Sequence, residues 1–377
     1  MRHLSQKGMS IVEVMIALTI STILTIGVVQ LFVANSETYN MLVGQSRVQE
    51  NARFALEYIS RSVRMAGYKG CYSVNGKVAT TITPPTAVPY EYDIRYSLGG
   101  YNGEADGIWL PALNNLPETF GGTDTSYVGG RGVPTDTIRT GASSADWTDV
   151  LVVRRISPNE LVLADDMLTS SDDIIVNKPA SGFDFGCVGC LENTARDDLA
   201  LIYDCEKSTI FRVTDIIDGP AAGQATIRHN AADLNPQNGT TQLAEFNTFE
   251  GLDAGVAAIL TDIFYIAPGS GVNNAGDTPW SLWLKSGPNT PVEIVEGIEN
   301  LQIEFGVDTD NDDIPNQYVS PNMVAATDLK DVITVRVEII ATSVDDVGST
   351  QLKPGGGAAD GVMRREFSQT MQIRNKG

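Results

Sequence analysis

An apolar segment near the N-terminus constrains this chain more than any other feature. Residues 9–34 form 26 consecutive positions with a single charge, that of Glu13. As a helix this segment is about 39 Å long, which is enough to cross a bilayer. A secretory signal peptide has an apolar region of only about 7–15 residues, so a membrane span is the better interpretation. Arg2 and Lys7 precede it, and the positive-inside rule therefore predicts a cytoplasmic tip and a body on the far side.

The carboxylate of Glu13 needs an explanation, because an ionised acid at the centre of a bilayer costs about 3 kcal/mol. Glu13 lies near the cytoplasmic end of the segment, where a plain anchor tolerates an acid that snorkels to the surface. Alternatively, a cation beside the carboxylate offsets the cost of burying it. The residues around Glu13 favour the second explanation.

The stretch KGMSIVEVMIALTI resembles the class III leader of type IV pilins and type II secretion pseudopilins. The resemblance implies that a prepilin peptidase cuts after Gly8, that Met9 becomes the N-methylated first residue, and that Glu13 becomes the fifth. In that family the carboxylate at this position is thought to meet the N-terminal amine of a neighbouring subunit and to set the register of assembly. Met9 stands where the family usually has Phe.

The helical pattern continues beyond the membrane segment and predicts one helix from about Ser10 to Ala66, with Gly67 just past its end. We expect residues 9–34 to lie in the membrane or the filament core, and residues 35–67 to pack on a globular head. Apolar residues at spacings of three and four form the face expected to pack on the head: Val48, Ala52, Ala55, Leu56, Ile59, Val63 and Ala66. The opposite face carries Arg47, Glu50, Arg53, Glu57, Arg61 and Arg64, in which Glu50 with Arg53 and Glu57 with Arg61 have favourable spacings.

The rest of the chain, residues 68–377, is expected to form one β-rich head. Alternating apolar residues predict strands over 333–339 and 367–373, joined by a hairpin tip at 345–360. Further strands are predicted at 150–154, 160–164, 199–203, 209–213, 257–266, 281–284 and 293–307. The predicted fold class is therefore α+β: a long N-terminal helix packed on an antiparallel sheet, with long loop insertions.

Charge and composition exclude several classes of function. The net charge of −21 argues against nucleic acid as a partner of the head, because phosphate backbones need clustered Lys and Arg. The two histidines, His3 and His229, make a His-dependent triad or a His-rich zinc site a poor interpretation. No phosphate loop, nucleophile elbow or dinucleotide fingerprint occurs, so we do not expect an enzyme and predict no cofactor apart from the calcium alternative below.

Four further stretches resemble the PilW-type minor pilins: residues 46–71, 197–214, 303–319 and 364–375. The resemblance implies a pilin-like fold and a structural minor pilin that acts in a tip complex priming assembly of the type IV pilus. It implies as partners the prepilin peptidase, other minor pilins, the major pilin and a large tip adhesin. It places the chain in the bacterial inner membrane with a periplasmic head, and then in the pilus at the cell surface. A minor pseudopilin of type II secretion and a calcium-dependent adhesive module remain the alternatives.

Alternating carboxylates at Asp308, Asp310 and Asp312 are spaced like the first ligands of a calcium loop. An EF-hand is excluded, because its sixth position needs Gly and is Asp313, and its twelfth needs Glu and is Val319. We favour an acidic hairpin turn after the strand that ends at Val307. A calcium site that orders a loop is the alternative.

The cysteines are Cys71, Cys187, Cys190 and Cys205, and all follow the membrane segment. Outside the cytoplasm disulfides are the default, and four cysteines allow three pairings. A zinc site of all four is an alternative. The resemblance to the PilW type implies Cys71 with Cys205, which leaves Cys187 with Cys190. A long-range pairing of Cys71 with one of the other two stays open.

Overall fold

The structure is a computed structural model of the chain. It describes residues 10–70, 78–83, 93–104, 108–110, 147–178, 199–230, 238–239, 254–286, 291–324, 326–351 and 359–375. Structural statements below concern these residues.

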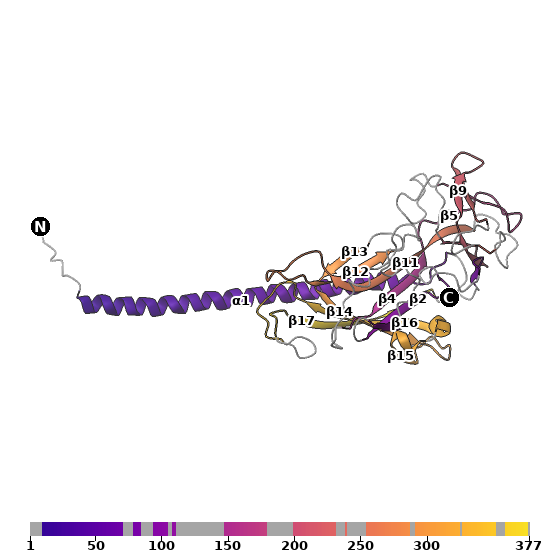
Figure 1. Cartoon of the computed structure of the whole chain (residues 1–377). Coiled ribbons are helices and arrows are strands. Elements are labelled where there is room, and N and C mark those ends of the chain that lie inside the picture. Colours follow the sequence, from indigo (N-terminus) through magenta and orange to yellow (C-terminus); the bar gives the residue numbers. More distant parts are fainter. Residues whose placement is uncertain are drawn as a thin grey trace.

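Helix α1, Ile11–Arg64, is a single helix of 54 residues, about 80 Å long. Its first part extends away from the head as an isolated rod, and its second part lies against the strands of the head (Figure 1). The sequence predicted this helix to within two residues at each end. Gly67 follows it with φ +71°, a backbone conformation that residues other than glycine rarely adopt.

The head is built from short and long strands. In the first half of the chain these are β1 Val78–Thr80, β2 Leu98–Glu104, β3 Ile108–Leu110, β4 Val150–Ile156, β5 Leu161–Val162, β6 Ile174–Asn177, β7 Leu199–Tyr203, β8 Ser208–Arg212, β9 Asp215–Asp218 and β10 Gln224–Arg228. They continue with β11 Gly255–Pro268, β12 Trp280–Ser286, β13 Val292–Glu296, β14 Ile298–Val307, β15 Gln317–Val319, β16 Val332–Thr342 and β17 Arg364–Gln372. Two 3₁₀ turns, Pro321–Met323 and Ala326–Asp331, lie between β15 and β16.

These strands form three sheets. The C-terminal sheet has the order β15-β14-β16-β17, and its described pairs are all antiparallel. The largest sheet has the order β1-β8-β7-β11-β4-β2-β3. In addition, β12 pairs with β11, β13 pairs with β12, and β5 pairs with β11. A small sheet, β6-β10-β9, completes the head. The observed class is α+β, as the sequence predicted.

The main core lies between α1, the C-terminal sheet and the β4, β11 and β12 part of the large sheet. It joins Ile59 and Val63 of the helix to Phe305 and Val337 of the C-terminal sheet and Phe264 of β11. A second core fills the space around β5 to β8 and β10. The helix therefore packs on the sheet formed by the last part of the chain.

Three details of the head differ from the sequence predictions. The strand predicted at 293–307 is two strands, because Gly297 between them has φ +76°, and a Cβ there would lie 2.6 Å from the Thr342 carbonyl oxygen. The pair β1 with β8 is parallel, whereas the predicted head was antiparallel. The strands β1, β2, β3, β6, β9 and β10 had not been predicted.

Candidate functional site: the two halves of helix α1 and the aspartate loop

The first half of α1, residues 11–42, leaves its large apolar side chains without cover. Ile11 is 80% exposed and Phe32 is 74% exposed. The most apolar window of this helix has no residue buried against the rest of the chain, and the helix is long and apolar enough to cross a membrane. Soluble monomers rarely expose an apolar surface of this extent. This half, which we call the bare half, therefore requires lipid or neighbouring protein around it.

The N-terminus of α1 is closed by a capping box between Ser10 and Glu13. The Ser10 hydroxyl accepts a hydrogen bond from the Val12 N–H at 3.3 Å, and the Glu13 carboxylate accepts one from the Ser10 N–H at 3.5 Å. A carboxylate here also faces the positive end of the helix dipole. Our sequence interpretation missed this role, although the S-x-x-E spacing in SIVE signals it.

Glu13 thus has a local partner in addition to the intermolecular one that the family resemblance implies. Gly8 and Met9, the predicted cleavage and methylation positions, lie outside the described residues. Cleavage, methylation and the pairing of Glu13 with a neighbour's amine stay predictions.

The second half of α1, residues 44–64, buries the face that the sequence predicted. All seven predicted residues, from Val48 to Ala66, are less than a tenth exposed. Gly44 lies so close to the loop after β16 that a Cβ would be 2.8 Å from Cγ1 of Val347. Beside it, the Arg47 guanidinium lies 3.4 Å from the Asp345 carboxylate. We call this the docked half, and it joins the bare half to the head as one continuous helix.

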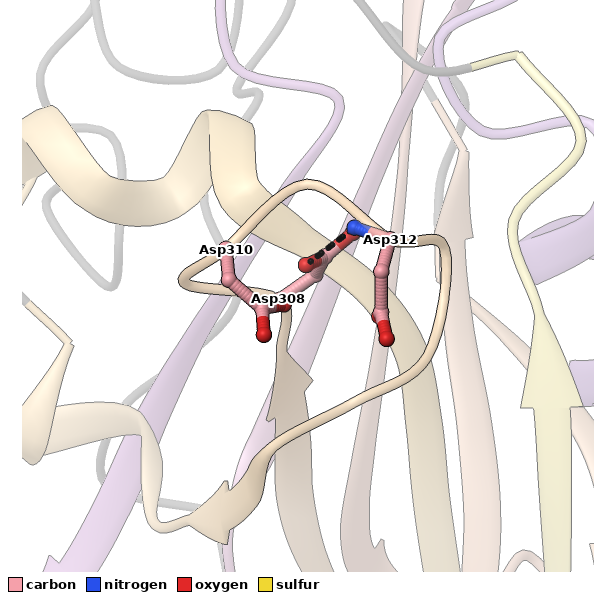
Figure 2. A group of neighbouring side chains, drawn as sticks. All are labelled: Asp308, Asp310 and Asp312. Carbon is pink, nitrogen blue, oxygen red and sulfur yellow. Dashed lines mark hydrogen bonds between the residues drawn. The ribbon is translucent and has the colours of Figure 1, made fainter.

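The loop between β14 and β15 gathers three carboxylates. One ligand oxygen from each of Asp308, Asp310 and Asp312 lies within 4.8 Å of the others. Asp308 is 3% exposed, whereas the other two are exposed. Figure 2 shows the three side chains, with the bond from the Asp312 N–H to the Asp308 carboxylate.

The side chain of Asp308 organises this loop through hydrogen bonds with the backbone of the residues that follow it. Its carboxylate accepts hydrogen bonds from the N–H groups of Asn311, Asp312 and Asp313 at 2.7, 3.3 and 3.0 Å. Asp313 adopts φ +66°, the left-handed conformation for which calcium loops use Gly, and Asp tolerates it better than most residues. The predicted hairpin is confirmed, because β14 pairs with β15 across this loop.

The aspartate loop fits Ca²⁺ in its chemistry, because hard carboxylate oxygens are the ligands that this ion prefers. Three carboxylates are fewer than the six to eight oxygens of a calcium shell, so backbone carbonyls or water would complete it. The loop also satisfies Asp308 without any ion, as the three backbone bonds show. Calcium binding therefore stays a hypothesis.

Cys205 lies in the turn between β7 and β8 and is disulfide-bonded. Cys71, Cys187 and Cys190 lie outside the described residues. The pairing of Cys71 with Cys205 and of Cys187 with Cys190 stays a prediction.

Comparison with known proteins connects both ends of the chain to one kind of assembly. Residues 263–375 match the family described as type IV pilus-assembly protein W, and residues 4–29 match the prokaryotic N-terminal methylation motif. The first match ends with the sheet on which the docked half packs, and the second spans the leader and the start of the bare half. No protein of curated function and no solved structure matches the chain. The two matches support membrane anchoring and pilus association, and they support the identification of the chain as a PilW-type, type IV pilus-related minor pilin.

Proposed function

We propose that this chain is a structural subunit of the complex that primes a type IV pilus and remains at its tip. A prepilin peptidase cuts the leader after Gly8, and the new N-terminus at Met9 is methylated. The bare half of α1 then leaves the inner membrane and joins the helical core of the filament. Its partners are the other minor pilins, the major pilin and a large tip adhesin.

The observation that carries this proposal is the uncovered bare half of α1, which continues directly into the helix packed on a large head. A helix with its whole apolar surface uncovered is built to move from lipid to a surface of neighbouring helices. The head that follows, about 310 residues, is bulky for a unit repeated along a thin fibre, which favours a place at its end. The match to the type IV pilus-assembly family supports the pilus over the type II secretion alternative.

The proposal is tested by placing the subunit on the fibre. In cells that lack the chain we expect few or no surface pili, and we expect the wild-type chain to restore them. Gold-labelled antibody against the head should then decorate pilus ends. Normal numbers of pili without the chain, or label spread evenly along the shaft, would contradict the priming and tip role.

As a second candidate role, we propose that the aspartate loop binds Ca²⁺ and orders a contact of the head. The convergence of Asp308, Asp310 and Asp312 is the observation that favours it. Isothermal titration of the full chain in detergent with CaCl₂ should show binding that the double variant Asp310→Asn, Asp312→Asn loses. The variant Asp172→Asn, Asp173→Asn is the control with the same change of charge. The absence of binding at about 10 mM Ca²⁺ would refute this role, because even the weak extracellular sites bind at millimolar concentrations.

A further inference from the structure

A groove runs along the solvent-facing side of the docked half of α1. Its volume is about 1250 Å³, and its walls are α1 itself, the middle of β17 with Arg374 just beyond that strand, and parts of β4, β11 and β12. Pockets for small molecules are typically about 300–1,000 Å³. The groove is therefore long and large enough for a segment of polypeptide.

The charge of this groove is opposite to that of the molecule. The chain has a net charge of −21, yet the groove is lined by five arginines and two carboxylates. The arginines are Arg53, Arg61, Arg64, Arg155 and Arg374, and the carboxylates are Glu57 and Asp262. The positive potential inside the groove attracts anions, whereas the acidic surface around it repels them. Anions are therefore drawn to the groove in preference to the rest of the surface.

One of the two carboxylates, that of Asp262, already has partners within the head. Asp262 is buried and lies 3.3 Å from the Arg155 guanidinium, and it also accepts a hydrogen bond from the Ser62 hydroxyl at 2.6 Å. A further hydrogen bond to Asp262 comes from the Ser286 hydroxyl. The charge of Arg155 is therefore matched within the head.

The other four arginines are not matched. Within the described part of the chain, Arg53, Arg61, Arg64 and Arg374 make no ion pair and no hydrogen bond, although all four are exposed at the groove. The spacing of Glu57 and Arg61 does not close into an ion pair in this structure. In a chain with 47 acidic and 26 basic residues, four unpaired arginines at one groove are an unusual use of positive charge.

The groove also has apolar parts. Leu56, Leu284 and Phe367 line it, and Tyr58, which is 37% exposed, stands at its rim. An occupant that uses the whole groove has carboxylates for the arginines and at least one apolar side chain for these residues. A polypeptide segment has both.

Other anionic partners fit less well. Arg53 lies 19 residues beyond the end of the apolar segment at Ala34, about 28 Å along the helix, whereas charges are screened within about 10 Å at ordinary salt. Lipid headgroups are therefore too far away to bind here. A long nucleic acid would have to cross the acidic surface outside the groove, which repels it.

We propose that this arginine groove binds a carboxylate-rich segment of another pilus subunit, and that it is a subunit interface of the tip complex. The inference rests on the proposed function, because it takes the partner from the same assembly. It adds a surface on the head to the contacts made by the bare half.

Binding of an acidic peptide to the full chain in non-ionic detergent tests this proposal. The probe is a fluorescein-labelled peptide of six glutamates and one phenylalanine, followed by fluorescence anisotropy at about 0.15 M salt. The groove variant carries Arg→Gln at positions 53, 61, 64 and 374. The control variant, Lys178→Gln, Arg228→Gln, Lys330→Gln and Arg336→Gln, loses the same charge at sites outside the groove.

We expect the wild type and the control variant to bind the peptide, and the groove variant to bind at least about tenfold more weakly, because each exposed ion pair adds a modest increment. Equal binding by the groove variant, or no binding by the wild type, would overturn the proposal. Tighter and groove-dependent binding of an oligothymidylate, of anionic lipid vesicles or of a second copy of the chain would overturn the choice of partner. Thermal unfolding followed by circular dichroism verifies that both variants are folded.

This peptide assay does not depend on pilus assembly. Loss of tip labelling with intact peptide binding would count against the proposed function alone. Tip labelling that persists while the peptide fails to bind would count against the arginine groove alone.

Discussion

The two halves of helix α1 are one continuous helix, but they satisfy their apolar side chains in opposite ways. The docked half buries one stripe, from Val48 to Ala66, against the head and turns its arginines to solvent. The bare half exposes apolar residues all round, from Ile11 to Leu42. Neither half is stabilised by propensity alone, because most helical stability in proteins comes from packing of the apolar face. The docked half finds this packing within its own chain, and the bare half has to find it outside.

The head therefore buries its apolar side chains within its own chain, whereas the bare half needs other molecules to cover its apolar surface. Burial of a large apolar side chain stabilises a fold by roughly 1.5–3 kcal/mol, and the bare half leaves many such side chains unburied. Substitutions in the docked half should therefore change the stability of the head. Substitutions in the bare half should change membrane insertion and assembly, and leave the head as it is.

The largest effect is expected from the leader. Gly8→Ala should block cleavage, because the resemblance to class III leaders places the cut after this glycine. Immunoblots should show only the longer, unprocessed species, and the chain should be absent from sheared pili. Normal processing of the variant would refute the cleavage position, and Ser5→Ala serves as the control within the same leader.

The next effect contrasts the two halves directly. Ile59→Ala removes a fully buried side chain of the docked half and should lower the free energy of unfolding of the head by about 2–5 kcal/mol. Leu24→Ala removes a side chain of the bare half that is 65% exposed, and should change this free energy by less than about 0.5 kcal/mol. Urea denaturation in detergent measures both. Equal losses in the two variants would show that the bare half also packs on the head.

The sequence predicted much of this architecture, because the signals were local and regular. The apolar stripe of the docked half identified its buried apolar side chains, although not the buried Gly44, Ser60 and Ser62. The alternation at 333–339 and 367–373 identified the hairpin of β16 and β17. Long segments with one period and one face in the core are the most predictable elements.

The remaining features were not predicted from the sequence, and particular strands show the physical reasons. No strand was predicted at β2, because its glycines interrupt any apolar alternation. Gly103 is needed there, since a Cβ would lie 2.4 Å from the Thr148 carbonyl oxygen. The strands β9 and β10 have only four and five residues, too few to show a period. The arginine groove is formed by residues more than 300 positions apart, Arg53 and Arg374, and only the folded head brings them to one surface.

A buried carboxylate of the head, that of Asp149, predicts a pH dependence of stability that the bare half does not share. Asp149 accepts backbone hydrogen bonds from Gly103 and Ile303, both at 2.8 Å, and its burial raises its pKa from 3.8 to about 7. Between these two pH values the folded head holds a proton that the unfolded chain has lost. The contribution of Asp149 to the free energy of unfolding should therefore fall as the pH rises from about 4 to about 7 and be constant above.

Asp149→Asn tests this dependence, because the amide does not titrate. The variant loses one of the two backbone bonds at every pH, so the informative quantity is the slope of stability against pH and not its level. Urea denaturation at several pH values should show a smaller decline for the variant than for the wild type. Parallel curves would show that Asp149 does not titrate in this range.

A smaller effect is expected from two glycines of α1. Gly44→Ala in the docked half places a methyl group against Val347 and should lower stability by about 1 kcal/mol, since the gain in helix propensity only partly offsets the contact. Gly27→Ala in the bare half meets no atom within 4 Å, and should leave head unfolding unchanged. Thermal unfolding of the head distinguishes the two. An equal change in the unfolding temperature of the two variants would show that the two halves do not differ in their packing at these glycines.

The central claim is that the charge of Glu13, and not only its role as a helix cap, is needed for the bare half to assemble into the pilus. Glu13→Gln keeps the capping box, because glutamine serves in the same position, but removes the charge. Glu13→Ala removes both. The direct measurement is the amount of cleaved chain recovered in sheared pili for each variant. The account predicts normal cleavage and an equally strong loss from pili for Gln and Ala, whereas wild-type recovery of the Gln variant would show that capping alone explains Glu13.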